Sequence, residues 1–297
     1  MAHLISELKS IFRKGNIYIQ LIFINAAIFI FTTLLSVFLQ LFNQNTSQIF
    51  ETLELPASLS RLVTQPWSII TYMFMHAGIL HILFNMLWLY WFGNLFLYFF
   101  SSKHLRGLYF LSGICGGLFY IASYNIFPYF ASSVASSTMV GASASVLGIV
   151  VATAYREPNH QIQIFLFGTI RLKYIALIVI LSDLLFVTSG NAGGHIAHLG
   201  GALGGLWFAS SLKRGTDITS WINKLLDTIT KIFSKKTWKR KPKMEIHYNR
   251  DPKDYEYNAK KKAQSDEVDR ILEKLKKSGY DSLTTKEKKL LFDASKR

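Results

Sequence analysis

The sequence predicts an all-α integral membrane protein, with six transmembrane helices and a short helical tail in the cytoplasm. Half of its 297 residues are apolar, and the mean hydropathy is positive. Only 17% of the residues are charged, whereas an average soluble domain has about 25%. The charge is also unevenly placed, because 24 of the 33 lysines and arginines lie at or beyond Lys213. The chain before Lys213 is therefore suited to lipid, and the tail is suited to water.

Six apolar runs are the candidate membrane spans. A helix needs roughly 20 apolar residues to cross the hydrocarbon core of a bilayer. The runs are residues 18–42, 79–99, 105–126, 141–155, 172–187 and 194–212. The fourth and fifth runs are short, which is typical of helices that are surrounded by other helices rather than by lipid.

Basic residues in the connecting loops predict how the spans are oriented. With the N-terminus inside, the outer loops hold only Arg61, whereas the inner segments before the tail hold eight basic residues. These eight are Lys9, Arg13, Lys14, Lys103, Arg106, Arg156, Arg171 and Lys173. Cytoplasmic loops of membrane proteins carry an excess of lysine and arginine. We therefore expect both termini in the cytoplasm and place the protein in the plasma membrane of a bacterium.

The segments that flank the spans have their own patterns. Residues 1–17 place apolar residues at helical spacing with basic residues on the other side, which predicts an interfacial helix. Residues 213–263 are interpreted as a basic linker, and residues 264–297 as a small helical cytoplasmic domain. Within that domain we expect a helix at 266–277, a stop at Gly279 and a second helix that opens at Thr284. Membrane lipid is the expected partner of the basic tail, and nucleic acid is not expected.

Cysteine and histidine usage argues against a metal centre or another cofactor. Cys115 is the single cysteine, so no disulfide and no cysteine-based metal site can form within the chain. His195 and His198 lie three residues apart, but the sequence shows neither a third ligand nor a His-Glu-x-x-His pattern. No cleavable signal peptide is evident before or within the first span. The sequence therefore predicts a protein without cofactor or metal.

Polar side chains inside three of the spans predict a functional site. Ionisable or strongly polar residues are costly in a membrane and by default mark function. His81 and Asn85 lie four residues apart near the start of the second span, Ser143 opens the fourth, and His198 lies near the start of the sixth. All three spans run inward in the predicted orientation. Their polar residues therefore lie at a similar depth near the outer surface.

These residue types suit nucleophilic catalysis. A serine hydroxyl attacks efficiently only when a base removes its proton, and histidine is the usual base. His81, Asn85 and the backbone N–H of Ser143 could stabilise an oxyanion. Asp183 in the fifth span is not assigned a catalytic role and no acid is expected to orient His198, so a Ser-His dyad is predicted. We expect His195 to lie at the rim of the site.

Three motifs carry a family resemblance. The segments 81–88, 141–144 and 197–201 read HILFNMLW, GASA and AHLGG, and they resemble the hallmark motifs of the rhomboid family of intramembrane serine proteases. The resemblance covers residues 18–212 and implies a six-helix rhomboid-like bundle around a water-filled cavity.

The resemblance also implies roles for particular residues. Ser143 would be the nucleophile, His198 the general base, and His81 and Asn85 parts of the oxyanion hole. Gly201 would let the helices that carry Ser143 and His198 pack together. The fifth span and the loop at 188–193 would act as gate and cap, and the substrates would be transmembrane segments of other proteins.

Three positions depart from the family pattern, and other functions compete. Ser68 follows Trp67 where arginine is common, Leu147 replaces an aromatic residue beneath the imidazole, and Ala144 replaces a glycine. One alternative is a catalytically silent rhomboid-like protein that binds membrane helices, although such relatives generally lack the serine or the histidine. A channel or transporter would predict paired inverted repeats, which the sequence does not show.

Overall fold

The computed structural model describes residues 6–7, 10–12, 15–44, 50–164, 168–233 and 252–295. The chain divides into two compact units, Met1–Thr237 and Trp238–Arg297. The predicted interfacial helix at 1–17 lies largely outside the described residues. Its described pieces, 6–7 and 10–12, are helical.

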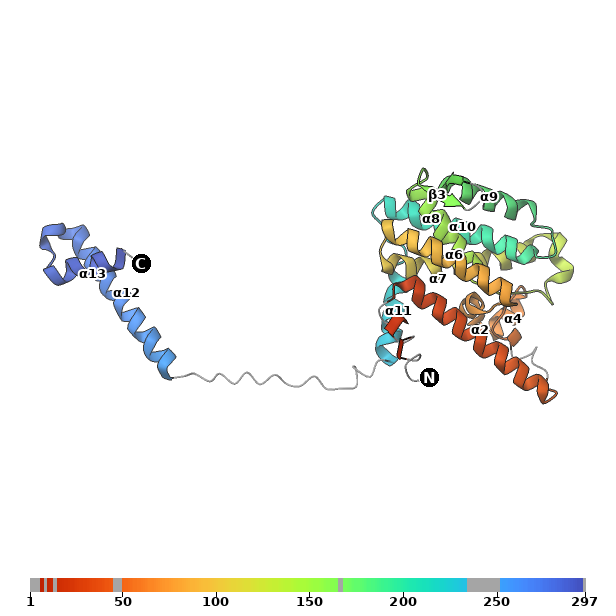
Figure 1. The fold of residues 1–297 in the computed structure, drawn as a ribbon, viewed down its shortest axis with the longest axis horizontal. Helices are drawn as coiled ribbons and strands as arrows, with labels where there is room; N and C mark the ends of the chain where they lie inside the picture. The colour runs from red at the N-terminus through yellow and green to blue at the C-terminus, as the bar shows by residue number, and fades with distance from the viewer. Residues whose placement is uncertain are drawn as a thin grey trace. The chain divides into compact units, whose positions relative to one another are not determined.

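Six helices of the first unit lie where the sequence predicts them (Figure 1). They are α2 (Ile17–Leu41), α6 (Ile79–Phe99), α7 (Ser102–Ile126), α8 (Ser143–Arg156), α9 (Leu172–Leu185) and α10 (Ala192–Lys213). Within the described part of the chain, α2, α6 and α7 are long and apolar enough to cross a membrane. Helices α8 and α9 have only 14 residues each. The first unit is therefore a mostly helical membrane bundle.

The all-α prediction needs one correction, because two short antiparallel sheets lie in the connections. Strand β3 (Gln161–Ile164) pairs with β4 (Gly168–Arg171) between α8 and α9. Strand β1 (Leu55–Pro56) pairs with β2 (Thr138–Met139), so the first long loop is joined to the segment that leads into α8. Strands this short add little hydrophobic pattern to the sequence, which explains why they were not expected.

The rest of this loop, which connects α2 to α6, is ordered in its described part by hydrogen bonds to its own backbone. It contains α4 (Leu59–Thr64), α5 (Ser68–Thr71) and the 3₁₀ turn η1 (Tyr72–Phe74), and a second 3₁₀ turn, η2 (Pro128–Ser133), follows α7. The indole N–H of Trp67 donates to the Thr52 carbonyl at 2.8 Å, and the Thr71 hydroxyl donates to the Leu53 carbonyl at 2.7 Å. These contacts hold two parts of the loop together, with Ser68 at the position where the family often has arginine.

Helices α7, α8 and α10 form the tightly packed centre of the bundle. A Cβ built on Gly201 would meet the backbone of Ala144, and one built on Gly205 would meet the backbone of Gly148. A Cβ on Gly116 would lie 2.8 Å from the Ala197 carbonyl oxygen. Small residues let helix backbones approach this closely. We call this contact the glycine seam, and it holds the start of α8 against α10.

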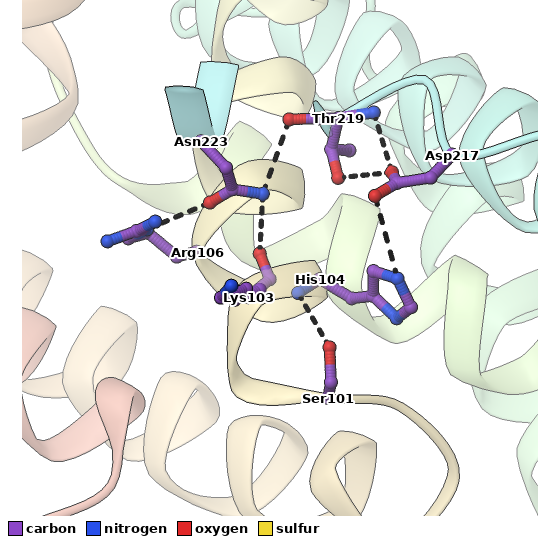
Figure 2. Close-up of polar contacts among 7 residues, drawn as sticks. All are labelled: Ser101, Lys103, His104, Arg106, Asp217, Thr219 and Asn223. Carbon is purple, nitrogen blue, oxygen red and sulfur yellow. Dashed lines mark hydrogen bonds and ion pairs between the residues drawn. The ribbon is translucent and has the colours of Figure 1, made fainter. Parts of the chain in front are cut away.

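A further helix occupies part of the segment that the sequence analysis interpreted as a linker. Helix α11 (Ser220–Phe233) packs against the beginning of α7. Figure 2 shows the polar contacts, in which the Arg106 Nε donates to Asn223 Oδ1 at 2.8 Å. The Asn223 amide in turn donates to the Lys103 carbonyl at 3.0 Å. Arg106 also forms an ion pair with Asp227 at 2.7 Å.

The linker interpretation is therefore wrong for residues 220–233, because α11 buries Ile222 and Asn223 against the bundle. One face of α11 remains exposed and apolar. Trp221, Leu225 and Ile229 lie on it at helical spacing.

The second unit contains α12 (Pro252–Ser278), η3 (Tyr280–Ser282) and α13 (Thr285–Ser295). Helix α12 begins well before the predicted start at 266 and ends next to Gly279, which has a φ of +75°. The Glu287 carboxylate accepts from the Thr284 N–H at 2.7 Å and from Lys274 Nζ at 3.0 Å. The first contact belongs to a capping box at the start of α13, and the second ties α13 to α12.

Candidate functional site

All four predicted site residues line one cavity in the first unit. The cavity has a volume of about 730 Å³, and its wall includes Ser143, His198, His81 and Asn85. Helices α6, α8, α9 and α10 and the loop before α10 all contribute to it. The three motifs, which are far apart in the sequence, therefore converge on one space.

Ser143 is placed by a glycine turn. Gly141 has a φ of +128°, a conformation that side chains strongly disfavour, and its N–H donates to the Tyr72 carbonyl at 2.9 Å. The Tyr72 hydroxyl donates to the Gly113 carbonyl of α7 at 2.6 Å, so the turn is tied to the packed centre. Ser143 is the first residue of α8. Its N–H consequently has no acceptor within the helix and lies at the positive end of the helix dipole.

His81 presents a donor toward the same turn. The Ala77 N–H approaches His81 Nδ1 at 3.4 Å, so Nδ1 is the acceptor and Nε2 carries the proton of a neutral ring. A Cβ built on Gly141 would lie 2.9 Å from His81 Nε2 and 3.6 Å from Ser143 Oγ. One point in space is thus close to both the hydroxyl and the imidazole donor. This arrangement suits an oxyanion site beside Ser143.

Asn85 lies one helical turn below His81. Its side-chain amide donates to the His81 carbonyl at 2.8 Å, which fixes the orientation of the amide and leaves its second N–H available. Asn85 is buried, yet it contributes to the wall of the cavity. It can therefore supply a further donor.

His198 shares the cavity with Ser143, but among the described residues no hydrogen bond joins their side chains. Catalytic hydrogen bonds often tighten only when substrate is bound. Leu147 also lines the cavity, at the position where the family often has an aromatic residue. Gly190 and Asn191 line it as well, in the loop that was expected to cap the site, and so does Gly193 at the start of α10.

The expectation that no acid orients His198 is wrong. Asp183 of α9 is buried, and its Oδ1 lies 2.9 Å from Nδ1 of His198 and 2.8 Å from Nδ1 of His195. His195 is therefore engaged in this contact rather than lying as a bare rim residue. A signal was present in the sequence, because Asp183 is the one acid within the six predicted spans.

The same cluster corrects the statement that no third metal ligand exists beside the two histidines. One ligand atom from each of Asp183, His195 and His198 lies within 4.8 Å of the others. In the structure Nδ1 of each histidine is hydrogen-bonded to Oδ1 of Asp183. A protein without metal or other cofactor remains our prediction.

His76 is a histidine beside His81 that the sequence analysis did not consider. Both of its ring nitrogens are buried without a hydrogen-bond partner in the described part of the chain. Its ring centroid lies 5.2 Å from that of His81, edge to face. It precedes α6 and so lies outside the predicted spans. The sequence analysis considered only polar residues inside the spans.

Comparison with known proteins identifies two families along the chain. Residues 63–214, about half of the chain, match the Rhomboid domain family, and residues 252–297 match a family of unknown function, DUF6576. Over 144 residues the chain is 28% identical to the RHOMBOID-like protein 12, mitochondrial, of Arabidopsis thaliana. That match covers 46% of this chain and 43% of the relative, so the chain spans less than half of the relative's length. The matched domain contains all three motifs and every residue named at the cavity, and the chain belongs to the rhomboid family.

Proposed function

We propose that this protein is an intramembrane serine endopeptidase that cleaves transmembrane segments of other proteins with Ser143 and His198. The observation that carries the proposal is the convergence of Ser143, His198, His81 and Asn85 on one cavity among the bundle helices. Family membership supports it, because rhomboid proteins include proteases with this set of groups.

The reaction follows from the roles that these groups can take. Ser143 Oγ attacks the carbonyl carbon of the scissile peptide while His198 accepts the hydroxyl proton. The carbonyl oxygen becomes an oxyanion that the Ser143 N–H, His81 Nε2–H and Asn85 amide stabilise, each by about 3 kcal/mol if well placed. His198 then protonates the leaving amine. Water attacks the acyl-enzyme in a second round, which regenerates Ser143.

The proposed setting is a bundle of six spans with both termini on the cytoplasmic side of a bacterial plasma membrane. Support comes from the eight inner basic residues against Arg61 outside. Under this topology the cavity opens toward the outer surface, because α6, α8 and α10 each begin there. The exposed apolar row of α11 would then lie in the inner membrane interface, where anionic lipid is the expected partner.

Purified full-length protein, reconstituted with a model transmembrane substrate, tests the proposal. We expect cleavage and fluorophosphonate labelling of the wild type, and both to fall at least about 10⁴-fold in Ser143→Ala and His198→Ala. Ser145→Ala is the matched control, because this hydroxyl lies two residues along α8, buried and without a hydrogen-bond partner among the described residues.

Two outcomes would contradict the proposal. Cleavage by Ser143→Ala at the wild-type rate would remove the nucleophile assignment. A folded wild type that binds the substrate helix without cleaving it or reacting with the probe would establish the catalytically silent alternative.

A further inference from the structure

Asp183 joins α9 to α10 through a carboxylate oxygen that two histidines share. Asp183 Oδ1 lies 2.8 Å from Nδ1 of His195 and 2.9 Å from Nδ1 of His198. Asp183 is buried, and its second oxygen has no hydrogen-bond partner in the described part of the chain. A buried carboxylate is stable only where donors compensate for its lost hydration, and here the imidazoles are those donors.

The contact determines which ring nitrogen of His198 is free. A carboxylate oxygen only accepts hydrogen bonds, so Nδ1 of each histidine must carry the donated proton. The neutral His198 ring then has its lone pair on Nε2. Since His198 lines the cavity together with Ser143, Nε2 is the atom available to take the serine proton.

The contact also supplies charge where the reaction creates it. His198 becomes an imidazolium when it accepts the proton of Ser143, and the Asp183 oxygen is 2.9 Å from its Nδ1. A carboxylate at that distance, itself buried, stabilises the cation. His195 bonds to the same oxygen but is not among the residues that line the cavity, so it can hold Asp183 in position without taking part at the serine.

We propose that Asp183 is a positioning residue that fixes the tautomer and orientation of His198, so that the site functions as Ser143-His198-Asp183. This inference rests on the proposed protease function. The inference replaces the predicted dyad with a triad, in which the acid comes from α9 and the histidine from α10.

The test compares Asp183→Ala, Asp183→Asn and Asp183→Glu in reconstituted full-length protein. The alanine variant removes both hydrogen bonds, and we expect kcat to fall about 10²- to 10⁴-fold with KM unchanged. Asparagine removes the charge and can turn its amide N–H toward Nδ1, which favours the wrong tautomer of His198, so we expect its kcat to be no higher than that of the alanine variant. Glutamate restores the charge, and we expect the kcat of Asp183→Glu to be at least tenfold higher than that of Asp183→Ala. Ser182→Ala, the preceding residue on α9, is the matched control and should leave kcat unchanged.

Thermal unfolding of each variant separates positioning from simple stability. A kcat for Asp183→Ala within about threefold of wild type would overturn the proposal. The proposal would also be overturned if Asp183→Ala had a lowered Tm, with KM and kcat both altered, and if Asp183→Glu did not recover activity. If a chelator raised the activity of the wild type but not that of Asp183→Ala, the cluster would be assigned to cation binding. That result would also overturn the proposal.

Failure of the inference is distinguishable from failure of the protease function. If wild type cleaves in a Ser143-dependent way and Asp183→Ala cleaves equally well, only the role of Asp183 is refuted. If wild type neither cleaves nor labels, the protease function itself is refuted.

Discussion

Substitution of Gly201 by alanine should disable the site without touching a catalytic group. A Cβ at this position would meet the carbonyl oxygen of Ala144 and would lie 2.7 Å from its carbonyl carbon and 2.9 Å from its Cα. Ordinary van der Waals contact begins at 3.4 Å. The obstructing atoms are backbone, which cannot rotate away, so α8 and α10 must separate by roughly 1 Å to relieve the overlap.

The expected magnitudes follow from that displacement. Overpacking of a tight core costs about 1–3 kcal/mol in the free energy of unfolding, which lowers Tm by roughly 2–10 °C for a domain of this size. Ala144 directly follows Ser143, so the same displacement separates the nucleophile from His198. A misplacement of about 1 Å can cost about 10²-fold in rate. We therefore expect kcat to fall by about that factor.

Gly204→Ala is the matched control on the same helix. Its nearest neighbours, Cys115 Cβ and Ser112 Cα, would lie 3.1 Å from the new Cβ, so a shift of a few tenths of an ångström suffices. Cleavage of the reconstituted substrate and thermal unfolding are measured for both variants. Wild-type kcat and Tm in Gly201→Ala would refute the reasoning, as would equal losses in the two variants.

Three further predictions concern the oxyanion site, the α11 contact and the tail. Asn85→Ala should lower kcat by about 10- to 10³-fold, less than loss of the dyad, because other donors remain; full activity in the cleavage assay would show that Asn85 is structural. Asn223→Ala leaves the Arg106 Nε without its acceptor. We therefore expect the free energy of unfolding to fall by about 1–3 kcal/mol while kcat stays unchanged. An unchanged Tm in thermal unfolding would contradict this. Hydrogen bonds from the Thr284 N–H, from Lys274 and from the Thr284 hydroxyl together lower the pKa of Glu287 to about 2 from 4.5, so this carboxylate stabilises the tail fully above about pH 4.5 and progressively less down to about pH 2. Digestion by pepsin across that window should reveal the loss in wild type, whereas Glu287→Gln should show no such pH dependence; parallel pH profiles would contradict the assignment.

The membrane bundle and the main site were predictable because their signals are local. Apolar runs set the positions of the six helices, and a polar residue inside such a run stands out. Ser143, His198, His81 and Asn85 were therefore found from sequence, and the structure places them around one cavity.

Asp183 was missed for a reason of topology. Its role depends on α9 running opposite to α10, which brings position 183 beside positions 195 and 198 across the intervening loop. The predicted orientation already implied this depth, because the fifth span runs outward and ends near the outer surface. Asp183 would have been identified if it had been considered together with His195 and His198, which lie at a similar predicted depth.

Helix α11 was missed because basic composition obscured a helical pattern. Trp221, Leu225 and Ile229 recur every four residues, which is a helix signal within the stretch interpreted as a linker. The docking of Asn223 against the start of α7 depends on tertiary contacts that no local pattern reveals.

Under the proposed function, the shared oxygen of Asp183 would make the entry of substrate and the orientation of His198 depend on opposite positions of α9. Both of its hydrogen bonds cross from α9 to α10, and such bonds weaken beyond about 3.2 Å, so moving α9 outward by roughly 1 Å disrupts both together. The glycine seam keeps α8 and α10 fixed meanwhile. If α9 is the element that moves aside for an entering helix, the imidazole loses its partner while the entrance is open and regains it on closure. Under that arrangement, a peptide that enters but does not allow α9 to return would occupy the cavity without being cut, and selectivity would arise at closure rather than at first contact.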